Sequence, residues 1–315
     1  MIGVLSAVAP VFGLLVVGQI LFRVHIFSDE FWQQSARLVY WVLMPSLLFW
    51  KLGSARFEGE LILPYAAALA GAFVLVVAGV RMAGAALSLP RPVTSSVLQG
   101  AARHNTFIAL AIAERIFGQA GLALASLAAA ILVLVTNMSI TPMMVELSRS
   151  DRDMNIGRAI LRDLYRNPIL IAVFSGLAVN ALPAPPFALA FDLTRLLGSA
   201  ALPLMLLCVG ASLRFETFRL SPGPLMLATV SKLIVFPLAV IALASIAGLS
   251  GVQALVLVIF AAVPTAASSQ ALARELGGDV PLMVNVVTLQ TALSFLTLPL
   301  TLLLAEGWFP LPPQF

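Results

Sequence analysis

The chain has 315 residues, of which 61% are hydrophobic and only 10% are charged, and its mean hydropathy is +1.04. Because a soluble domain carries about 25% charged residues, this composition excludes a soluble globular protein and predicts a polytopic protein surrounded by membrane lipid. The net charge of +4 is not gathered into a basic groove, so no nucleic-acid partner is expected, and the single cysteine, Cys208, excludes disulfides and cysteine metal sites.

Ten apolar runs bounded by charged residues, Pro or Gly are candidates for membrane spans, since a helix needs about 20 mostly apolar residues to cross. They lie near residues 3–22, 31–50, 61–82, 93–117, 119–146, 160–182, 188–212, 222–247, 252–276 and 280–305. The first run lacks a positive n-region and a cleavage signature, so it is expected to be a retained span. The predicted fold class is therefore an all-α polytopic membrane protein with ten transmembrane helices.

The charges in the loops predict the orientation, because Lys and Arg accumulate in short cytoplasmic loops. Eleven Lys and Arg residues fall on the side that is predicted to be cytoplasmic, and five of the eleven lie between residues 149 and 166. Three fall on the other side, namely Lys51, Arg56 and Arg115. This asymmetry predicts a protein of the cytoplasmic membrane with both termini on the non-cytoplasmic side.

The two halves of the chain resemble each other at a nearly constant offset. At 158 residues, Pro10 pairs with Pro168 and Pro45 pairs with Pro203, and at 160 residues Gly118 pairs with Gly278. The predicted domains are a first five-helix repeat over 1–146, a cytoplasmic linker over 147–159 and a second five-helix repeat over 160–315. Since each repeat has an odd number of spans, the second enters the membrane from the opposite face, which is the inverted topology of many secondary transporters.

Polar residues interrupt the fourth and ninth spans at positions that the offset of 160 residues pairs. Pro264 lacks an N–H and frees a backbone carbonyl, so it breaks or kinks the ninth span. A half-helix that begins after such a break directs its N–H groups at the crossing and favours an anion there. Arg103 adds a planar donor suited to a carboxylate, and a charge at membrane depth is a candidate functional residue. The candidate substrate-binding residues are Arg103, His104, Asn105, Thr106, Asn137, Pro264, Thr265 and Ser268.

Several roles stay open from the residues alone. Asn137 either faces the crossing or bridges two helices, and Ser268 either binds a ligand or bonds to its own helix. His104 either carries a proton or stays a neutral hydrogen-bonding ligand. Lys232 and Arg37 are expected to snorkel to a membrane interface. No metal and no cofactor is expected, while a coupling ion, H⁺ or Na⁺, is left open because carboxylates occur only toward the span ends.

Four segments together resemble the auxin efflux carrier family, which includes bacterial members associated with small carboxylates such as malonate or malate. These segments are residues 103–110, 166–168, 196–204, and 263–267 followed by 272–279. The resemblance implies crossed, broken fourth and ninth helices that work by an elevator-type movement. It also implies binding roles for Arg103, Asn105, Asn137 and the Pro264 crossing. His104 departs from the pattern, because a bulky apolar or aromatic residue is expected there.

The function expected from these features is secondary active transport of small organic anions, either mono- or dicarboxylates. A bile-acid-type sodium-coupled symporter of the same architecture is the alternative, and a channel is a further one. An enzyme is not expected, because the chain has two histidines, His25 and His104, and neither a His-Glu-x-x-His nor a Gly-x-Ser-x-Gly pattern. A homodimer is left open as the oligomeric state.

Overall fold

The computed structural model describes residues 2–55, 59–147, 166–182, 188–215 and 222–311. These residues form helices and connecting loops, and no strand occurs among them. Arg56 and nearly all of the predicted linker over 147–159 lie outside the described residues.

The helices of the first half follow the predicted spans closely. They are α1 (Ile2–Arg23), α2 (Asp29–Leu38), a π-helical turn η1 (Val39–Leu43), α3 (Met44–Ser54), α4 (Gly59–Ala86), α5 (Arg91–Ala102) and α6 (Thr106–Leu147). Within α6, Gly118 has φ 60° and ψ −144°, a conformation that residues with a Cβ avoid. This glycine interrupts α6 at the residue where the predicted fourth span ends and the fifth begins.

The second half contains the remaining helices. They are α8 (Pro168–Asn180), α9 (Ala188–Ser199), α10 (Ala201–Ser212), α11 (Pro222–Val230), a π-helical turn η2 (Ser231–Val235), α12 (Phe236–Ile246), α13 (Gly251–Ala262), α14 (Ser269–Glu275) and α15 (Val280–Glu306). Six described stretches are apolar and long enough to cross a membrane, and α8 and α13 are shorter apolar helices. The chain is thus a multi-pass membrane protein, while the count of ten crossings stays a prediction.

Both π-helical turns stand directly before a proline-containing helix. The N–H of Met44 bonds to the carbonyl of Val39, five residues back, and the N–H of Phe236 bonds to Ser231 in the same way. Pro45 and Pro237 follow these residues, and a proline ring clashes with the carbonyl four residues earlier. The extra residue in the turn is a common way for a helix to accommodate such a clash.

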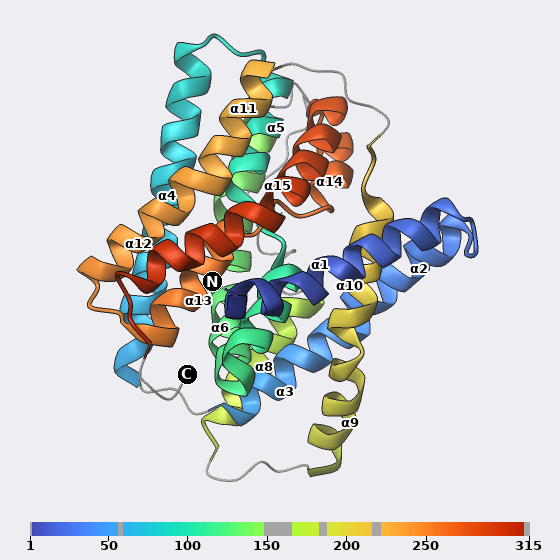
Figure 1. The fold of residues 1–315 in the computed structure, drawn as a ribbon, viewed down its shortest axis with the longest axis vertical. Helices are drawn as coiled ribbons and strands as arrows, with labels where there is room; N and C mark the ends of the chain where they lie inside the picture. Colours follow the sequence, from blue (N-terminus) through green and yellow to red (C-terminus); the bar gives the residue numbers. More distant parts are fainter. Residues whose placement is uncertain (1, 56–58, 148–165, 183–187, 216–221, 312–315) are drawn as a thin grey trace.

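The helices form two groups, with α6 in contact with both (Figure 1). In the first group, α1 packs against α10, and α3 packs against α8 and α9; this group fills the lower right of the figure. In the second, α4 packs against α12, α5 against α11, and α13 against α6 and α15. α6 contains the candidate residues Thr106 and Asn137, so the expected site lies where the two groups meet.

Two very close backbone contacts hold the first group together. A Cβ added to Gly18 would stand 2.1 Å from the carbonyl oxygen of Leu207, and one added to Gly176 would stand 3.0 Å from that of Phe49. Glycine favours such a close approach of two helix backbones, and at Gly18 any Cβ would force the backbones apart. The offset of 158 residues relates Gly18 to Gly176 and Phe49 to Leu207, so the two contacts correspond to each other between the halves.

Candidate functional site

The fourth predicted span is broken at the residues where polar side chains interrupt it. α5 ends at Ala102, and Arg103 has an extended backbone with φ −70° and ψ 153°. α6 begins at Thr106, and the side-chain oxygen of Asn105 accepts a hydrogen bond from the N–H of Ile108 at 3.2 Å. Asn105 therefore serves as the N-cap of α6, which satisfies one of the free N–H groups at the start of this half-helix.

The ninth predicted span is broken at the corresponding place. α13 ends at Ala262, and Val263 has φ −67° and ψ 151°, almost the backbone conformation of Arg103. The proline that follows explains this break, because Pro264 disfavours the helical conformation of the residue before it. The helix resumes as α14 at Ser269, so the gap is longer than in the first half.

Hydrogen bonds in both directions connect the two breaks. The backbone N–H of Asn105 donates to the carbonyl of Pro264 at 2.8 Å. The hydroxyl of Thr265 donates to the carbonyl of Gln99 at 3.1 Å. Non-helical backbone at membrane depth must find such partners inside the protein, because lipid offers none. Each broken segment therefore supplies hydrogen-bond partners for backbone groups of the other at the crossing.

Gln290 of α15 joins four segments at this crossing, and sequence reasoning missed it. Its side-chain oxygen accepts from the N–H of Thr265 at 3.0 Å. Its side-chain nitrogen donates to the carbonyls of Gly100 at 2.9 Å and Ala228 at 3.2 Å. Polar residues recur at every third position of this span, namely the buried Asn285, Thr288, Thr291 and Ser294, but Gln290 lies outside this register and the pattern does not identify it.

A cavity of about 460 Å³ opens beside the crossing, between the two helix groups. Six of the eight candidate residues line it, namely Arg103, His104, Asn105, Thr106, Asn137 and Ser268. Pro264 and Thr265 do not line it, because they are buried within the crossing. Among the described residues of the lining, Arg103 contributes a positive charge and no Asp or Glu occurs.

The N-terminus of α6 opens into the same cavity. Asn105, Thr106 and Phe107 all line it, so the first turn of this half-helix borders the space. The positive end of the helix dipole and the free N–H groups of a first turn favour a negative ligand. Arg103, which is half-buried, adds a permanent charge on the same side. The geometry thus suits a small anion.

Comparison with known proteins agrees with this architecture. Residues 3–302 match the model of a family described as membrane transport protein. The chain belongs to this family. It is the family of auxin efflux carriers that the sequence segments resemble. A protein named as an uncharacterized transporter, from Methanothermobacter thermautotrophicus strain Delta H, is 26% identical over 302 residues, which cover 95% of this chain and 97% of the relative.

In this transporter, His104 lies in the wall of the cavity. Its side chain is 7% exposed, and its ring lies 5.7 Å from that of Phe260, centroid to centroid. Neither ring nitrogen has a hydrogen-bond partner in the described part of the chain. A buried imidazole without partners is unusual, since buried polar atoms are nearly always bonded. The two roles left open by the sequence, proton carrier and neutral ligand, both remain.

The prediction that Lys232 snorkels to an interface is wrong. Its side chain is 0% exposed, and its ammonium nitrogen lies 4.5 Å from the centroid of the Phe236 ring. The physical reason is its position in η2, midway along the span, where α4, α5, α13 and α15 of the transporter surround it. Snorkelling requires a place near a helix end. Arg37, in the last turn of α2, is exposed as that prediction requires.

Lys51 also differs from its expected place in a loop. It lies within α3, its side chain is 4% exposed, and its ammonium donates to the side-chain oxygen of Gln119. The ammonium also lies 3.7 Å from the centroid of the Trp50 ring. This residue is therefore a packed helix residue and not a free loop charge.

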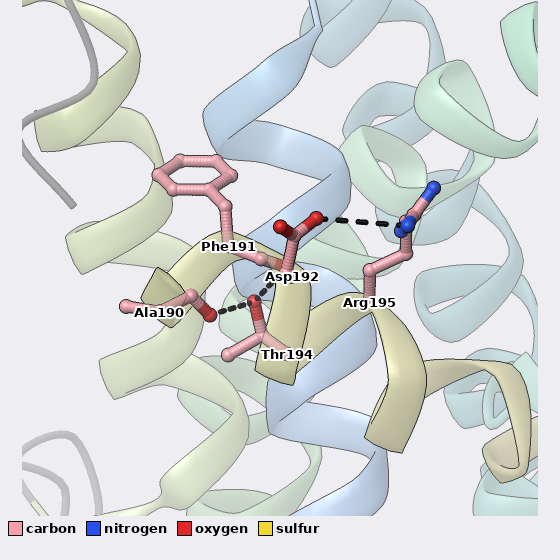
Figure 2. A network of polar contacts seen from close by, with 5 residues as sticks. All are labelled: Ala190, Phe191, Asp192, Thr194 and Arg195. Carbon is pink, nitrogen blue, oxygen red and sulfur yellow. Dashed lines mark hydrogen bonds and ion pairs between the residues drawn. The ribbon is translucent and has the colours of Figure 1, made fainter. Parts of the chain in front are cut away.

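A second cavity of the transporter, of about 390 Å³, suits an anion less well. Its lining includes Glu114 as well as Arg115 and Arg195, so both signs of charge are present. Figure 2 shows that Arg195 of α9 lies beside Asp192, and the two side chains form an ion pair at 3.6 Å. The positive charge of Arg195 is thus balanced by Asp192, and the cavity also contains the carboxylate of Glu114.

Proposed function

We propose that this membrane transporter is a secondary active carrier of small organic anions, mono- or dicarboxylates, across the cytoplasmic membrane. Its substrate binds in the cavity at the crossing of the α5–α6 and α13–α14 segments. Arg103, Asn105, Thr106 and the start of α6 contact the carboxylate, while Pro264 and Thr265 hold the crossing in shape.

The observation that carries this proposal is the charge and size of the cavity. Arg103 and the N-terminus of α6 are positive, and the described lining contains no carboxylate. A volume of about 460 Å³ falls in the range of small-molecule sites, which is about 300–1,000 Å³. A carboxylate that enters this space loses hydrogen bonds to water, and donors of the protein that already face the cavity would replace them.

Two further features support alternating access by an elevator-type movement. The cavity lies where the two helix groups meet, so a displacement of one group relative to the other would change its exposure. The matched helix ends at Ala102 and Ala262, and the matched contacts of Gly18 and Gly176, support an inverted repeat. In this arrangement both termini lie on the non-cytoplasmic side.

A ligand screen of the purified protein tests the proposal. Thermal unfolding is followed with acetate, malonate, malate and, as a cationic control, choline, each with and without sodium. We expect one or more carboxylates to raise the unfolding temperature, since a ligand that binds only the folded state stabilises it. Choline should have no effect. If no carboxylate stabilises the protein under any condition, the anion assignment is wrong.

Transport by reconstituted vesicles separates a carrier from a channel. Vesicles loaded with the stabilising carboxylate should accumulate the labelled form by exchange, and the rate should saturate with concentration. A rate that rises without saturation and shows no exchange would indicate a channel. A strict requirement for sodium would instead favour the bile-acid-type symporter.

A further inference from the structure

Lys232 is a buried amine that the proposed substrate contacts do not use. It is 0% exposed, and its nitrogen has no hydrogen-bond partner among the described residues. The Phe236 ring at 4.5 Å attracts a cation but does not replace the hydrogen bonds that an ammonium forms with water. A buried charge without a partner is strongly unfavourable, and such groups lose their charge instead.

The π-helical turn η2, which carries Lys232, packs against α5, and the residues that follow α5 line the cavity. The side chain of Gln290 donates to the carbonyls of both Gly100 and Ala228, so these two residues are neighbours. Lys232 follows Ala228 by four residues, and His104 follows Gly100 by four residues. Lys232 and His104 lie close enough to interact electrostatically, and His104 lines the cavity. An anion beside His104 would therefore lie within electrostatic reach of the amine.

The elements around Lys232 offer it no carboxylate partner in the described part of the chain. α11, α12 and α13 carry no charged or titratable residue. α15 carries only Glu306, in its last turn. The remaining titratable residues on the packed elements are Arg91 of α5, Arg103 and His104 after α5, and Glu60, Tyr65 and Arg81 of α4. Of these, Tyr65 donates its hydroxyl to the carbonyl of Leu124.

We propose that Lys232 takes up a proton when a carboxylate occupies the cavity beside Arg103 and His104. The proposed step begins from a neutral amine in the empty carrier, which the burial and the lack of a hydrogen-bond partner among the described residues favour. The bound anion supplies the negative charge that stabilises an ammonium, so a proton from solution forms the third N–H bond of this nitrogen. The inference rests on the proposed function, because the carboxylate is the group that makes protonation favourable.

The consequence is a coupling of substrate and proton within the carrier. With a dicarboxylate, Arg103 balances one negative charge and the protonated Lys232 balances the other. The positive charges of Arg103 and Lys232 then accompany the bound anion during the movement of the carrier. When the anion is released, Lys232 releases its proton. By reciprocity, the affinity for the anion increases as the pH falls, by up to about tenfold per pH unit.

The number of protons taken up per bound anion tests the inference directly. Malonate is titrated into the purified protein by calorimetry, in two buffers with different enthalpies of ionisation, from about pH 6 to about pH 8. The difference in apparent enthalpy between the buffers gives the number of protons exchanged. We expect uptake of up to one proton per malonate in the wild-type protein, with the larger uptake at the upper end of this pH range. Binding of malonate without proton uptake overturns the inference but leaves the proposed function intact.

Three variants identify the group that takes up the proton. Lys232→Met has a similar shape and cannot be protonated, and Lys232→Arg stays charged, so both should bind malonate without proton uptake. His104→Gln should retain the number of protons taken up per malonate bound, even where it lowers the affinity for malonate. If Lys232→Met keeps the uptake and His104→Gln loses it, His104 is the proton carrier and the inference is wrong. A single elution peak in size-exclusion chromatography verifies folding, and Lys232→Gln, which is also neutral, serves if Lys232→Met does not fold.

The same experiment distinguishes failure of the proposed anion binding from failure of the inference on Lys232. If wild-type protein binds neither malonate nor acetate nor malate at any pH, the anion assignment fails, and the inference on Lys232 fails with it. If binding is present and Lys232→Met changes neither the proton count nor the pH dependence, only the inference on Lys232 fails.

Discussion

The backbone N–H of Asn105 donates to the carbonyl of Pro264 at 2.8 Å, across 159 positions of the chain. This bond involves no side chain, so it persists in any substitution of Asn105 other than proline. It connects the two half-helices at the point where both lose their regular hydrogen bonding. The side chain of Asn105 is thereby free for two other tasks, the capping of α6 and contact with the cavity.

Variants of Asn105 separate these two tasks. Asn105→Ala loses the cap, which costs about 0.5–2 kcal/mol, and it also removes the amide from the cavity. Asn105→Asp keeps the cap, since aspartate is an equally good N-cap residue, but it places a negative charge beside the proposed anion. We expect Asn105→Asp to unfold near the wild-type temperature and to lose carboxylate transport. Normal transport in this variant would contradict the proposed position of the anion.

Arg103→Ala should abolish transport of carboxylates without abolishing membrane insertion. The variant removes the permanent positive charge from the cavity lining. Arg103→Lys should recover only part of the rate, because an ammonium lacks the planar pair of donors that matches a carboxylate. Uptake into vesicles measures the effect, and the amount of protein in the membrane fraction measures insertion. Arg37→Ala, at an exposed position of α2, is the matched control and should transport normally.

Gln290→Leu should destabilise the transporter by about 2–4 kcal/mol, because it removes three hydrogen bonds and leaves buried groups unsatisfied. Gln290→Glu should also destabilise the transporter, since it keeps the acceptor for Thr265 but places a carboxyl group against the carbonyls of Gly100 and Ala228. Thermal unfolding in detergent measures both. Gln253→Leu, a half-buried glutamine of α13, is the control and should unfold near the wild-type temperature. Equal behaviour of the variants at both positions would show that Gln290 does not hold the crossing.

Substitution of three glycines tests the backbone contacts in graded order. Gly18→Ala places a Cβ 2.1 Å from the oxygen of Leu207, and Gly176→Ala places one 3.0 Å from that of Phe49. Overpacking costs about 1–3 kcal/mol and more where backbone must move, so Gly18→Ala should be the most destabilising. Gly79→Ala meets no atom within 4 Å and should be neutral or slightly stabilising. The unfolding temperatures should follow this order.

Two loop serines test the orientation that the loop charges predict. Ser88 lies between α4 and α5, and Ser250 lies between α12 and α13; both are exposed. The natural thiol, Cys208, is buried and is removed as Cys208→Ala. In intact cells a membrane-impermeant maleimide should label Ser250→Cys and should label Ser88→Cys only after permeabilisation. The opposite pattern would reverse the predicted topology.

The helix boundaries and both breaks could be predicted because their causes are local. Pro264 disturbs its own span, Gly118 adopts a conformation that only glycine tolerates, and a four-residue polar cluster interrupts an apolar run. Each of these signals can be read from a short window of sequence. The cavity lining follows from them, since the residues at a break in a membrane helix face protein or a wet space.

Gln290 and Lys232 could not be placed in the same way, because their surroundings come from distant parts of the chain. Gln290 bonds to Gly100, 190 positions away, and no spacing pattern connects the two. Lys232 lies mid-span, and whether such a lysine reaches an interface depends on which helices enclose it. The sequence predicts the apolar character of α4, α13 and α15 but not that all three surround η2.

The contacts of Gly18 with Leu207 and of Gly176 with Phe49 also bear on how the protein is made. Each contact joins a helix of the first half to a helix of the second, and it leaves no side chain that could rotate aside. Because synthesis proceeds from the N-terminus, α1 and α3 enter the membrane before α8 and α10 exist. The surfaces of α1 and α3 around Gly18 and Phe49 therefore face lipid until the second half of the chain has been synthesised and inserted.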